Sequence, residues 1–446
     1  MLAIVVSSLL FCVYWVSRQL PAAPGFVALY ACGDKFVSKR KNDAAVIKDA
    51  QAAFLILKLT SVNIDSTSQT VNATLPLGLF KQTAVYSPKV GCTLAKNKTV
   101  AELKQQALSY TFEIDRKAQH SFNVASKNET LETLLDKTFE EPTGSSQRNT
   151  RVIIVIKHGK ILAERYATGF NQQSPLLGWS MTKGLMNAIT GILIKQSQLT
   201  LTQNNLLPLW QNDQRANITI ENLLNMDTGL AFAEGYGLGG DATIMLFNSA
   251  DTSAYAADMP LEYKLGTHWS YSSGTTNLLA HMLRKQAGLD AAEFYDFMYR
   301  ELFNPLGMTS MVIQTDESGD PIASSFGYAT ARDWAKFGLL YLNNGVWNGQ
   351  QILPKGWTDY TRLPLPHAEK GGYKAQFWLN SGEKNNPENR YFDKLPTDFY
   401  AALGHEGQQL MISPSLNMIV VRLGRTIDDS WDENTFISNV IKATTF

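Results

Sequence analysis

The sequence contains 446 residues, and its 40 Lys and Arg residues balance 40 Asp and Glu residues, so the formal net charge is zero. Such a chain has no global field to attract nucleic acid, an anionic membrane or an acidic partner. Its length predicts two or three domains with a sizeable core. The six histidines and three cysteines lack the spacings of metal sites, so we expect no metal and no cofactor.

Apolar residues dominate the first stretch, Met1 to Val16, and Arg18 and Pro21 end it. This run is short for a transmembrane helix of about 20 residues and long enough for the core of a signal peptide. We therefore expect residues 1–20 to be an export signal or a membrane anchor, with the protein in the periplasm or otherwise outside the cytoplasm. By the positive-inside rule, however, the basic residues that follow the run favour a topology in which the rest of the chain stays in the cytoplasm.

Two cysteines lie beyond this run, Cys32 and Cys92. In an oxidising compartment they could form one disulfide, and otherwise they would be buried thiols. The sequence leaves both alternatives open.

Residues 21–140 are expected to form a separate N-terminal extension. Two predicted strands, Phe54–Leu59 and Thr70–Leu75, flank the polar turn Asn63–Ser66. Helices are predicted at Val100–Leu108 and Thr130–Phe139. This part contains no catalytic pattern, so we interpret it as a packing or positioning extension.

A polar linker at 140–150 precedes a predicted hairpin, Arg151–Ile156 with Ile161–Tyr166. Its first strand is apolar on both faces, which is typical of a central strand in a covered sheet. Residues 201–300 have mostly helical patterns and should form a helical lobe. The remaining predicted elements are the helices Ile218–Met226, Thr276–Gln286 and Thr330–Leu342 and the strands Tyr400–Leu403, Gln408–Ser413 and Met418–Leu423.

A hydroxyl and an amine three residues apart, Ser180 and Lys183, stand at the start of a predicted helix. Residues at this spacing share one helix face, so the amine can reach the hydroxyl. Serine needs a base to become a nucleophile, and a free lysine is protonated at neutral pH. The helix dipole and apolar neighbours would both lower the lysine pKa. Alone, the pattern also fits a helix cap beside a solvated lysine.

Two later stretches strengthen this interpretation. The first, Trp269–Gly274, places the phenol of Tyr271 before a helix, where it could relay a proton if a nearby ammonium lowered its pKa. The second, Leu403–Gln408, is a strand edge whose glycines allow close approach of a ligand.

In this order and spacing the three stretches resemble the serine beta-lactamase and penicillin-binding-protein superfamily, whose signature is S-x-x-K, then S-D-N or Y-x-N, then K-T-G. The class C-like branch, which includes esterases and 6-aminohexanoate-dimer hydrolases, is the most similar. The resemblance extends from about Val152 to Leu423 and is supported by Met226–Leu230 and Thr330–Trp334. It implies an α/β (α+β) fold in which an antiparallel sheet is flanked by helices beside a helical lobe, with residues 151–446 as the beta-lactamase-like serine hydrolase domain.

By this resemblance Ser180 is the acylated nucleophile, Lys183 its base and Tyr271 the proton shuttle. The backbone N–H groups of Ser180 and Gln408 would form the oxyanion hole. Substrate-binding residues would be Ser273, His405 and Gly407. The sequence departs from the family where Ser273 replaces an asparagine and His405 replaces a lysine.

A neutral histidine supplies no fixed cation for a substrate carboxylate, so an ester or small linear amide fits better than a beta-lactam. The alternatives are a penicillin-binding or D-alanyl-peptide hydrolase, a beta-lactamase, and a non-catalytic binding protein that keeps the fold. A triad of Ser180, His405 and an aspartate is a weaker rival, because the sequence around Ser180 lacks the second glycine of G-x-S-x-G.

Overall fold

The structure is a computed structural model, and it describes residues 17, 19–116, 121–143, 147–237, 239–428 and 430–445. The predicted signal or anchor, Met1 to Val16, therefore lies outside the described residues. Within the described ranges, no helix is both long enough and apolar enough to cross a bilayer.

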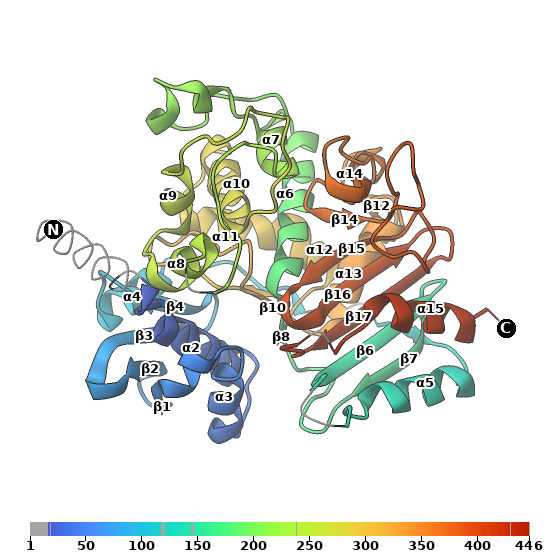
Figure 1. The fold of residues 1–446 in the computed structure, drawn as a ribbon, viewed down its shortest axis with the longest axis horizontal. Coiled ribbons are helices and arrows are strands. Elements are labelled where there is room, and N and C mark those ends of the chain that lie inside the picture. The colour runs from blue at the N-terminus through green and yellow to red at the C-terminus, as the bar shows by residue number, and fades with distance from the viewer. Residues whose placement is uncertain are drawn as a thin grey trace, which may run out of the picture.

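An eight-stranded sheet organises the part of the molecule that contains the chain's last strands (Figure 1). Its order is β13-β14-β15-β16-β17-β6-β7-β5, and only the pairing of β5 with β7 is parallel. The predicted hairpin is confirmed as β6 and β7, and β6 is buried along nearly its whole length. The strands of this sheet are β5 (Asn123–Val124), β6 (Thr150–Lys157), β7 (Lys160–Tyr166), β13 (Tyr373–Lys374), β14 (Phe377–Leu379), β15 (Tyr400–Gly404), β16 (Gln408–Ser413) and β17 (Met418–Gly424).

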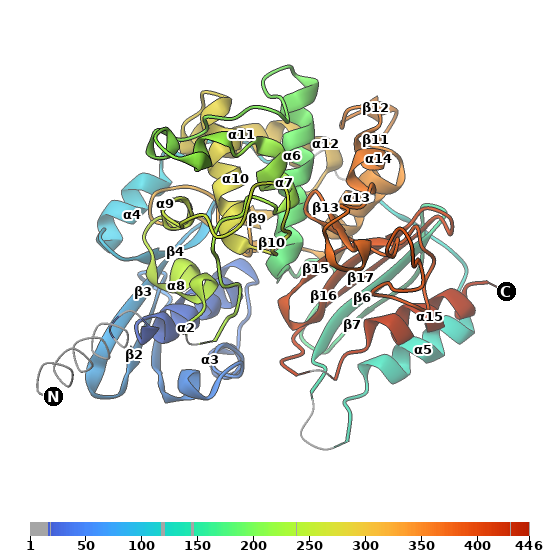
Figure 2. The same cartoon turned by 45° about the horizontal axis from the view of Figure 1, so that its top comes forward.

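Helices cover both faces of this sheet, as expected for strands whose side chains are buried on both faces (Figure 2). On one face α13 (Ala331–Leu342) packs over β6, β16 and β17. On the other face α5 (Glu129–Phe139) and α15 (Glu433–Ala443) enclose a second apolar cluster. The predicted helices at Thr130–Phe139 and Thr330–Leu342 are therefore confirmed.

The helical lobe follows β7 and stands beside the sheet (Figures 1 and 2). Its central pair is α6 and α10, which pack against each other. The lobe contains α6 (Lys183–Lys195), α7 (Ile220–Asn225), α8 (Asp241–Asn248), α9 (Thr252–Ala257), α10 (Ser273–Gln286), α11 (Ala291–Met298) and α12 (Asn304–Leu306). Short strands and one helix complete the chain between these parts: β8 (Leu176–Leu177), β9 (Val312–Ile313), β10 (Gly327–Ala329), β11 (Val346–Trp347), β12 (Gln350–Gln351) and α14 (Trp357–Thr361).

Residues 19–116 form a layer of their own, which we call the N-terminal layer. A four-stranded antiparallel sheet packs against helix α2, and α2 also contacts α8 of the lobe. Its elements are α2 (Ala22–Cys32), α3 (Asp43–Ala50), α4 (Val100–Ala107), β1 (Ser61–Asp65), β2 (Thr70–Leu75), β3 (Leu79–Ser87) and β4 (Gly91–Ala95).

The first hairpin of this layer differs from the prediction. The apolar run Phe54–Leu59 is not a strand, because Leu55–Leu59 winds into a 3₁₀ helix that leaves Leu55 and Leu59 exposed. The strand that pairs with β2 is instead β1, in the register Asp65 opposite Thr70. The turn lies at residues 66–69, past the predicted position, and the Asp65 carboxylate accepts hydrogen bonds from the backbone N–H groups of Thr67 and Ser68 within it.

A disulfide joins Cys32, at the end of α2, to Cys92 in β4. It settles the alternative that the sequence left open. Both cysteine side chains are fully buried, between α2 and the sheet of this layer. The bond therefore fixes the end of α2 to the sheet on which this helix packs.

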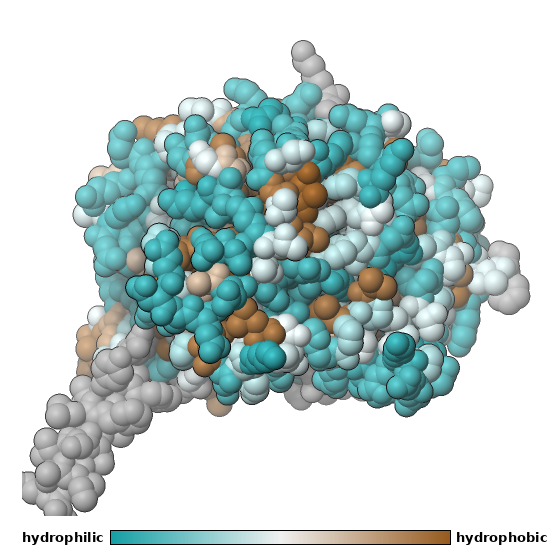
Figure 3. All heavy atoms as spheres, turned by 90° about the horizontal axis from the view of Figure 1, so that it is seen from above, coloured by the Kyte–Doolittle hydropathy of each residue, from teal (hydrophilic) through white to brown (hydrophobic). Residues whose placement is uncertain are grey.

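Buried apolar side chains of the N-terminal layer, the lobe and one face of the main sheet form one continuous cluster. By contrast, the face seen in Figure 3 is mainly hydrophilic, with hydrophobic residues in small separate patches. The N-terminal layer therefore shares the core of the other two parts.

Replacing Cys32 and Cys92 together by serine is expected to lower the free energy of unfolding of the N-terminal layer by about 2–4 kcal/mol, because the cross-link no longer restricts the unfolded chain. Urea unfolding of the variant and of the wild type measures this difference. Peptide mapping of the non-reduced wild type is the control, and recovery of both cysteines as free thiols would contradict the disulfide.

Candidate active site

Ser180 lies in a short 3₁₀ turn, Trp179–Thr182, between β8 and α6. Trp179 has φ = 47°, in the left-handed region, and such strain in a bulky residue costs about 1–3 kcal/mol. Position 178 must be glycine, because a Cβ on Gly178 would lie 2.6 Å from the Trp334 ring. The serine is therefore presented by a strained and tightly packed turn.

Lys183, the first residue of α6, holds its amine against the serine hydroxyl. Its Nζ atom bonds to Ser180 Oγ at 2.9 Å, to Ser273 Oγ at 3.0 Å and to the Ser324 carbonyl oxygen at 2.9 Å. These three contacts match the three N–H donors of an ammonium group. The structure thus brings together the hydroxyl and amine that the sequence spacing pairs.

Burial of Lys183 changes its acidity. The residue is 1% exposed, and loss of hydration lowers its pKa to about 8, while the negative charge of Glu234 acts in the opposite direction. A free lysine has a pKa near about 10.4. The side chain is therefore far more available as a neutral base near neutral pH than a solvated lysine would be.

Tyr271 lies two residues before helix α10, whose first turn is capped by the hydroxyl of Ser272. The Lys183 Nζ atom lies 4.8 Å from the centre of the Tyr271 ring. Burial raises the pKa of the Tyr271 phenol well above its usual value, and a hydrogen bond with Ser180 offsets this only in part. The lowered pKa that was the condition for a proton relay is therefore not found, and the phenol is neutral.

Ser273 connects Lys183 to a carboxylate that the sequence did not indicate. Glu234, in the loop between α7 and α8, accepts hydrogen bonds from the backbone N–H and the hydroxyl of Ser273, both at 2.6 Å. Burial raises the pKa of Glu234. The hydroxyl of Ser273 is buried and bonds to both Lys183 and Glu234. Its contact with a substrate stays a prediction.

The third stretch forms the tight hairpin between β15 and β16, in which Gly404 pairs with Gln408. A Cβ on Gly404 would lie 2.2 Å from the carbonyl oxygen of Gly178, so β15 passes directly along the Trp179–Thr182 turn. Gly407 has φ = 79°, and its position over the Arg422 side chain leaves no room for a Cβ. Strand β16 also contacts the turn, as an oxyanion hole built partly from the Gln408 N–H would require.

His405, at the tip of this hairpin, packs between two aromatic rings. Its ring centre lies 5.3 Å from that of Trp179 and 4.8 Å from that of Tyr236, a second residue that the sequence did not indicate. Burial lowers the pKa of His405, so its ring is neutral at pH 7. Because the Ser180 hydroxyl bonds to Lys183, the arrangement matches a lysine-base site rather than a triad with His405.

Aromatic residues form an apolar wall beside Tyr271. Its ring stacks on Trp378 at 5.2 Å and meets Tyr373 edge-to-face at 5.9 Å. A cavity of about 350 Å³ borders the β15–β16 hairpin, and residues 403–409 supply part of its lining. The aromatic wall thus lies beside Tyr271, whereas the cavity lies along the hairpin and its lining includes neither Ser180 nor Tyr271.

Comparison with known proteins gives matches over most of the chain. The family model described as "Beta-lactamase" matches residues 135–425, more than half of the sequence. The 6-aminohexanoate-dimer hydrolase of Paenarthrobacter ureafaciens is 23% identical over 299 residues, which cover 61% of this chain and 72% of that protein.

Two solved structures share the fold. A Bacillus anthracis protein provisionally named a 6-aminohexanoate-dimer hydrolase superposes with a TM-score of 0.58 and 22% identity, covering 75% of this chain and 89% of its own. The hydrolase EstCE1, which has promiscuous acyltransferase activity, superposes with a TM-score of 0.56 and 14% identity, covering 71% and 97%. At these identities the similarity concerns the fold.

Replacing Glu234 by glutamine is expected to lower the pKa of Lys183 below about 8, because the carboxylate's negative charge favours the protonated amine. Glutamine still offers an oxygen to Ser273. NMR titration of ¹³Cε-labelled lysine, with the signal assigned by its loss in Lys183→Met, measures the midpoint. Glu262→Gln removes an exposed carboxylate of the lobe and serves as the matched control. An unchanged or raised midpoint in Glu234→Gln would contradict the assignment.

Proposed function

Because the chain belongs to the beta-lactamase family, we propose that it is a serine hydrolase that forms an acyl-enzyme on Ser180 and transfers the acyl group to water. The observation that carries this proposal is the pairing of Lys183 with Ser180. The two polar atoms lie 2.9 Å apart, and burial brings the pKa of the amine to about 8.

In the first half-reaction, neutral Lys183 accepts the hydroxyl proton while Ser180 Oγ bonds to the substrate's carbonyl carbon. Backbone N–H groups of Ser180 and Gln408 stabilise the oxyanion. The proton then passes through the neutral Tyr271 hydroxyl to the leaving group as its bond to the carbonyl carbon breaks. Water repeats these steps on the acyl-enzyme, releases the acid and restores both residues.

The proposed substrate is an ester or a small linear amide. His405 occupies the position of the lysine in the family's third motif, and its lowered pKa leaves that position uncharged. A substrate with a carboxylate there would lack a cationic partner. The wall formed by Tyr271, Tyr373 and Trp378 supports an apolar acyl or leaving group.

We also propose that the enzyme works outside the cytoplasm. The buried Cys32–Cys92 disulfide supports an oxidising compartment. The apolar sequence of Met1 to Val16 fits an export signal or an anchor.

Hydrolysis of p-nitrophenyl butyrate tests the activity. Ser180→Ala is expected to lower kcat by about 10⁴-fold or more, because the nucleophile is lost. Ser270→Ala, in the same stretch as Tyr271, is the matched control and should retain activity. If the wild type shows no turnover, the non-catalytic binding protein becomes the better account.

Substrate preference is tested by replacing His405 with lysine. The new ammonium should raise kcat/KM for nitrocefin, which carries a carboxylate, by about tenfold to a hundredfold, since a charge-assisted hydrogen bond contributes about 1.5–3 kcal/mol. Turnover of the uncharged ester serves as the control and should not rise. A wild type that hydrolyses nitrocefin faster than the ester would instead identify a beta-lactamase, and a stable penicillin adduct on Ser180 would identify a penicillin-binding enzyme.

A further inference from the structure

The N-terminal layer reaches the residue that precedes the nucleophile. The ring of Trp179 lies 6.1 Å from Phe26 and 6.2 Å from Tyr30, both on α2. Its indole N–H donates to the Glu406 carboxylate at 3.4 Å. The strained Trp179 backbone leads directly into Ser180. Contacts that hold the Trp179 ring therefore also hold the turn Trp179–Thr182, which we call the nucleophile turn.

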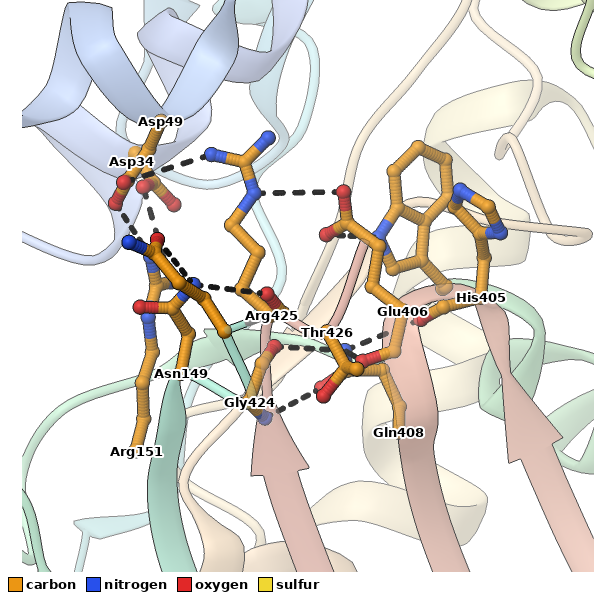
Figure 4. A network of polar contacts seen from close by, with 12 residues as sticks. Asp34, Asp49, Asn149, Arg151, His405, Glu406, Gln408, Gly424, Arg425 and Thr426 are labelled. Atoms are coloured by element: carbon orange, nitrogen blue, oxygen red, sulfur yellow. Dashed lines mark hydrogen bonds and ion pairs between the residues drawn. The ribbon is translucent and has the colours of Figure 1, made fainter. Parts of the chain in front are cut away.

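Arg425, which directly follows β17, links Glu406 to this layer (Figure 4). Its Nε atom lies 3.4 Å from Glu406 Oε1, and its Nη1 atom lies 3.6 Å from Asp49 Oδ1 on α3. The guanidinium carbon also lies 4.5 Å from the centre of the Tyr30 ring. Arg425 is 1% exposed and Glu406 is 5% exposed, so water barely screens their interaction.

Carboxylates of the N-terminal layer pair with arginines that lie outside this layer. Arg151 of the main sheet bonds to Asp49 at 2.6 Å and lies 3.8 Å from Asp34, which is fully buried. Arg40 of the layer bonds to both aspartates, at 2.5 Å and 2.6 Å. Three guanidinium groups thus face three carboxylates, and two of those carboxylates belong to the layer. Without them, Arg151 and Arg425 would be buried with Glu406 as their one counter-charge in this network.

Glu406 also shapes the hairpin that carries Gln408. Its backbone adopts φ = 61°. Its carbonyl oxygen accepts hydrogen bonds from Arg422 at 3.1 Å and from the side-chain amide of Gln408 at 3.2 Å. Its carboxylate therefore connects Trp179 to Arg425, while its backbone holds the start of β16. One residue joins both sides of the proposed oxyanion hole.

The matched family region covers residues 135–425, so it includes Arg151, Glu406 and Arg425 but not Asp34 or Asp49. Resting on the proposed function, we propose that the N-terminal layer is a positioning part of this active site. Asp49 holds Arg425 by the ion pair at 3.6 Å, Arg425 holds Glu406, and Glu406 fixes the nucleophile turn and the β15–β16 hairpin. None of these side chains touches the reacting atoms.

The test uses the full chain with Asp49→Asn and Glu406→Gln, each of which removes one charge and keeps the side chain's size. Both should lower kcat for p-nitrophenyl butyrate by about tenfold and leave KM within about twofold, because the reacting groups are displaced while the aromatic rings of Tyr373 and Trp378 keep their positions. Asp43→Asn is the matched control, since Asp43 also lies on α3 and pairs with Lys35 at 2.5 Å, away from this network. It should leave both constants unchanged.

A double variant separates positioning from a general loss of stability. The double variant combines Asp49→Asn with Glu406→Gln. If Asp49 acts through Arg425 and Glu406, it should lose little more activity than Glu406→Gln alone. Multiplied losses would overturn the proposal, as would an Asp49→Asn variant whose kcat equals that of Asp43→Asn.

Hydrogen–deuterium exchange gives a readout that needs no turnover. Peptides covering 178–183 and 403–408 should exchange faster in Asp49→Asn and Glu406→Gln than in the wild type and Asp43→Asn. Equal exchange in all four proteins would contradict the positioning role. A wild type without turnover but with these exchange differences would reject the proposed hydrolase and retain the positioning role.

Discussion

The dehydrated Lys183 amine against the Ser180 hydroxyl is the interaction on which the rest of this site depends. Removing water lowers the pKa of the amine to about 8, and three acceptors hold it in place. A base with a pKa near the working pH combines a useful neutral fraction with proton affinity. Glu234 opposes the shift, so burial and one carboxylate together set the protonation of the amine that we propose as the base. Tyr271 differs, because burial keeps its phenol neutral.

This chemistry requires a rigid frame, because a serine in a strained turn keeps its position only while its neighbours hold it. The frame comes from three regions: the rings of α2, the β15–β16 hairpin and the charge network that ends at Arg425. The conformational strain at Trp179 and the buried charges of Arg151 and Arg425 are each compensated by residues far away in sequence. A fold of this kind can combine a family hydrolase region with an added layer, provided that the layer brings its own counter-charges.

Local patterns predicted much of this structure. The spacing of Ser180 and Lys183 and the Tyr271 stretch identified residues that the fold brings together, and the apolar β6 hairpin predicted the centre of the sheet. The strand at Phe54–Leu59 was wrong, because apolar composition alone does not say whether a segment has a pairing partner. Glu234 and Tyr236 lie in a glycine-rich loop without periodicity, so only the tertiary fold reveals them. The same holds for the link between Asp34 and Asp49 and Arg151, which is more than a hundred residues away from both.

The most direct test of the central claim is the rate at which a fluorophosphonate modifies Ser180, measured by intact mass between about pH 6 and 10. If buried Lys183 is the base, the rate rises with pH through a midpoint near pH 8 as the amine loses its proton, and Lys183→Met abolishes the reaction. A rate that does not change with pH, or one that survives in Lys183→Met, would contradict the account.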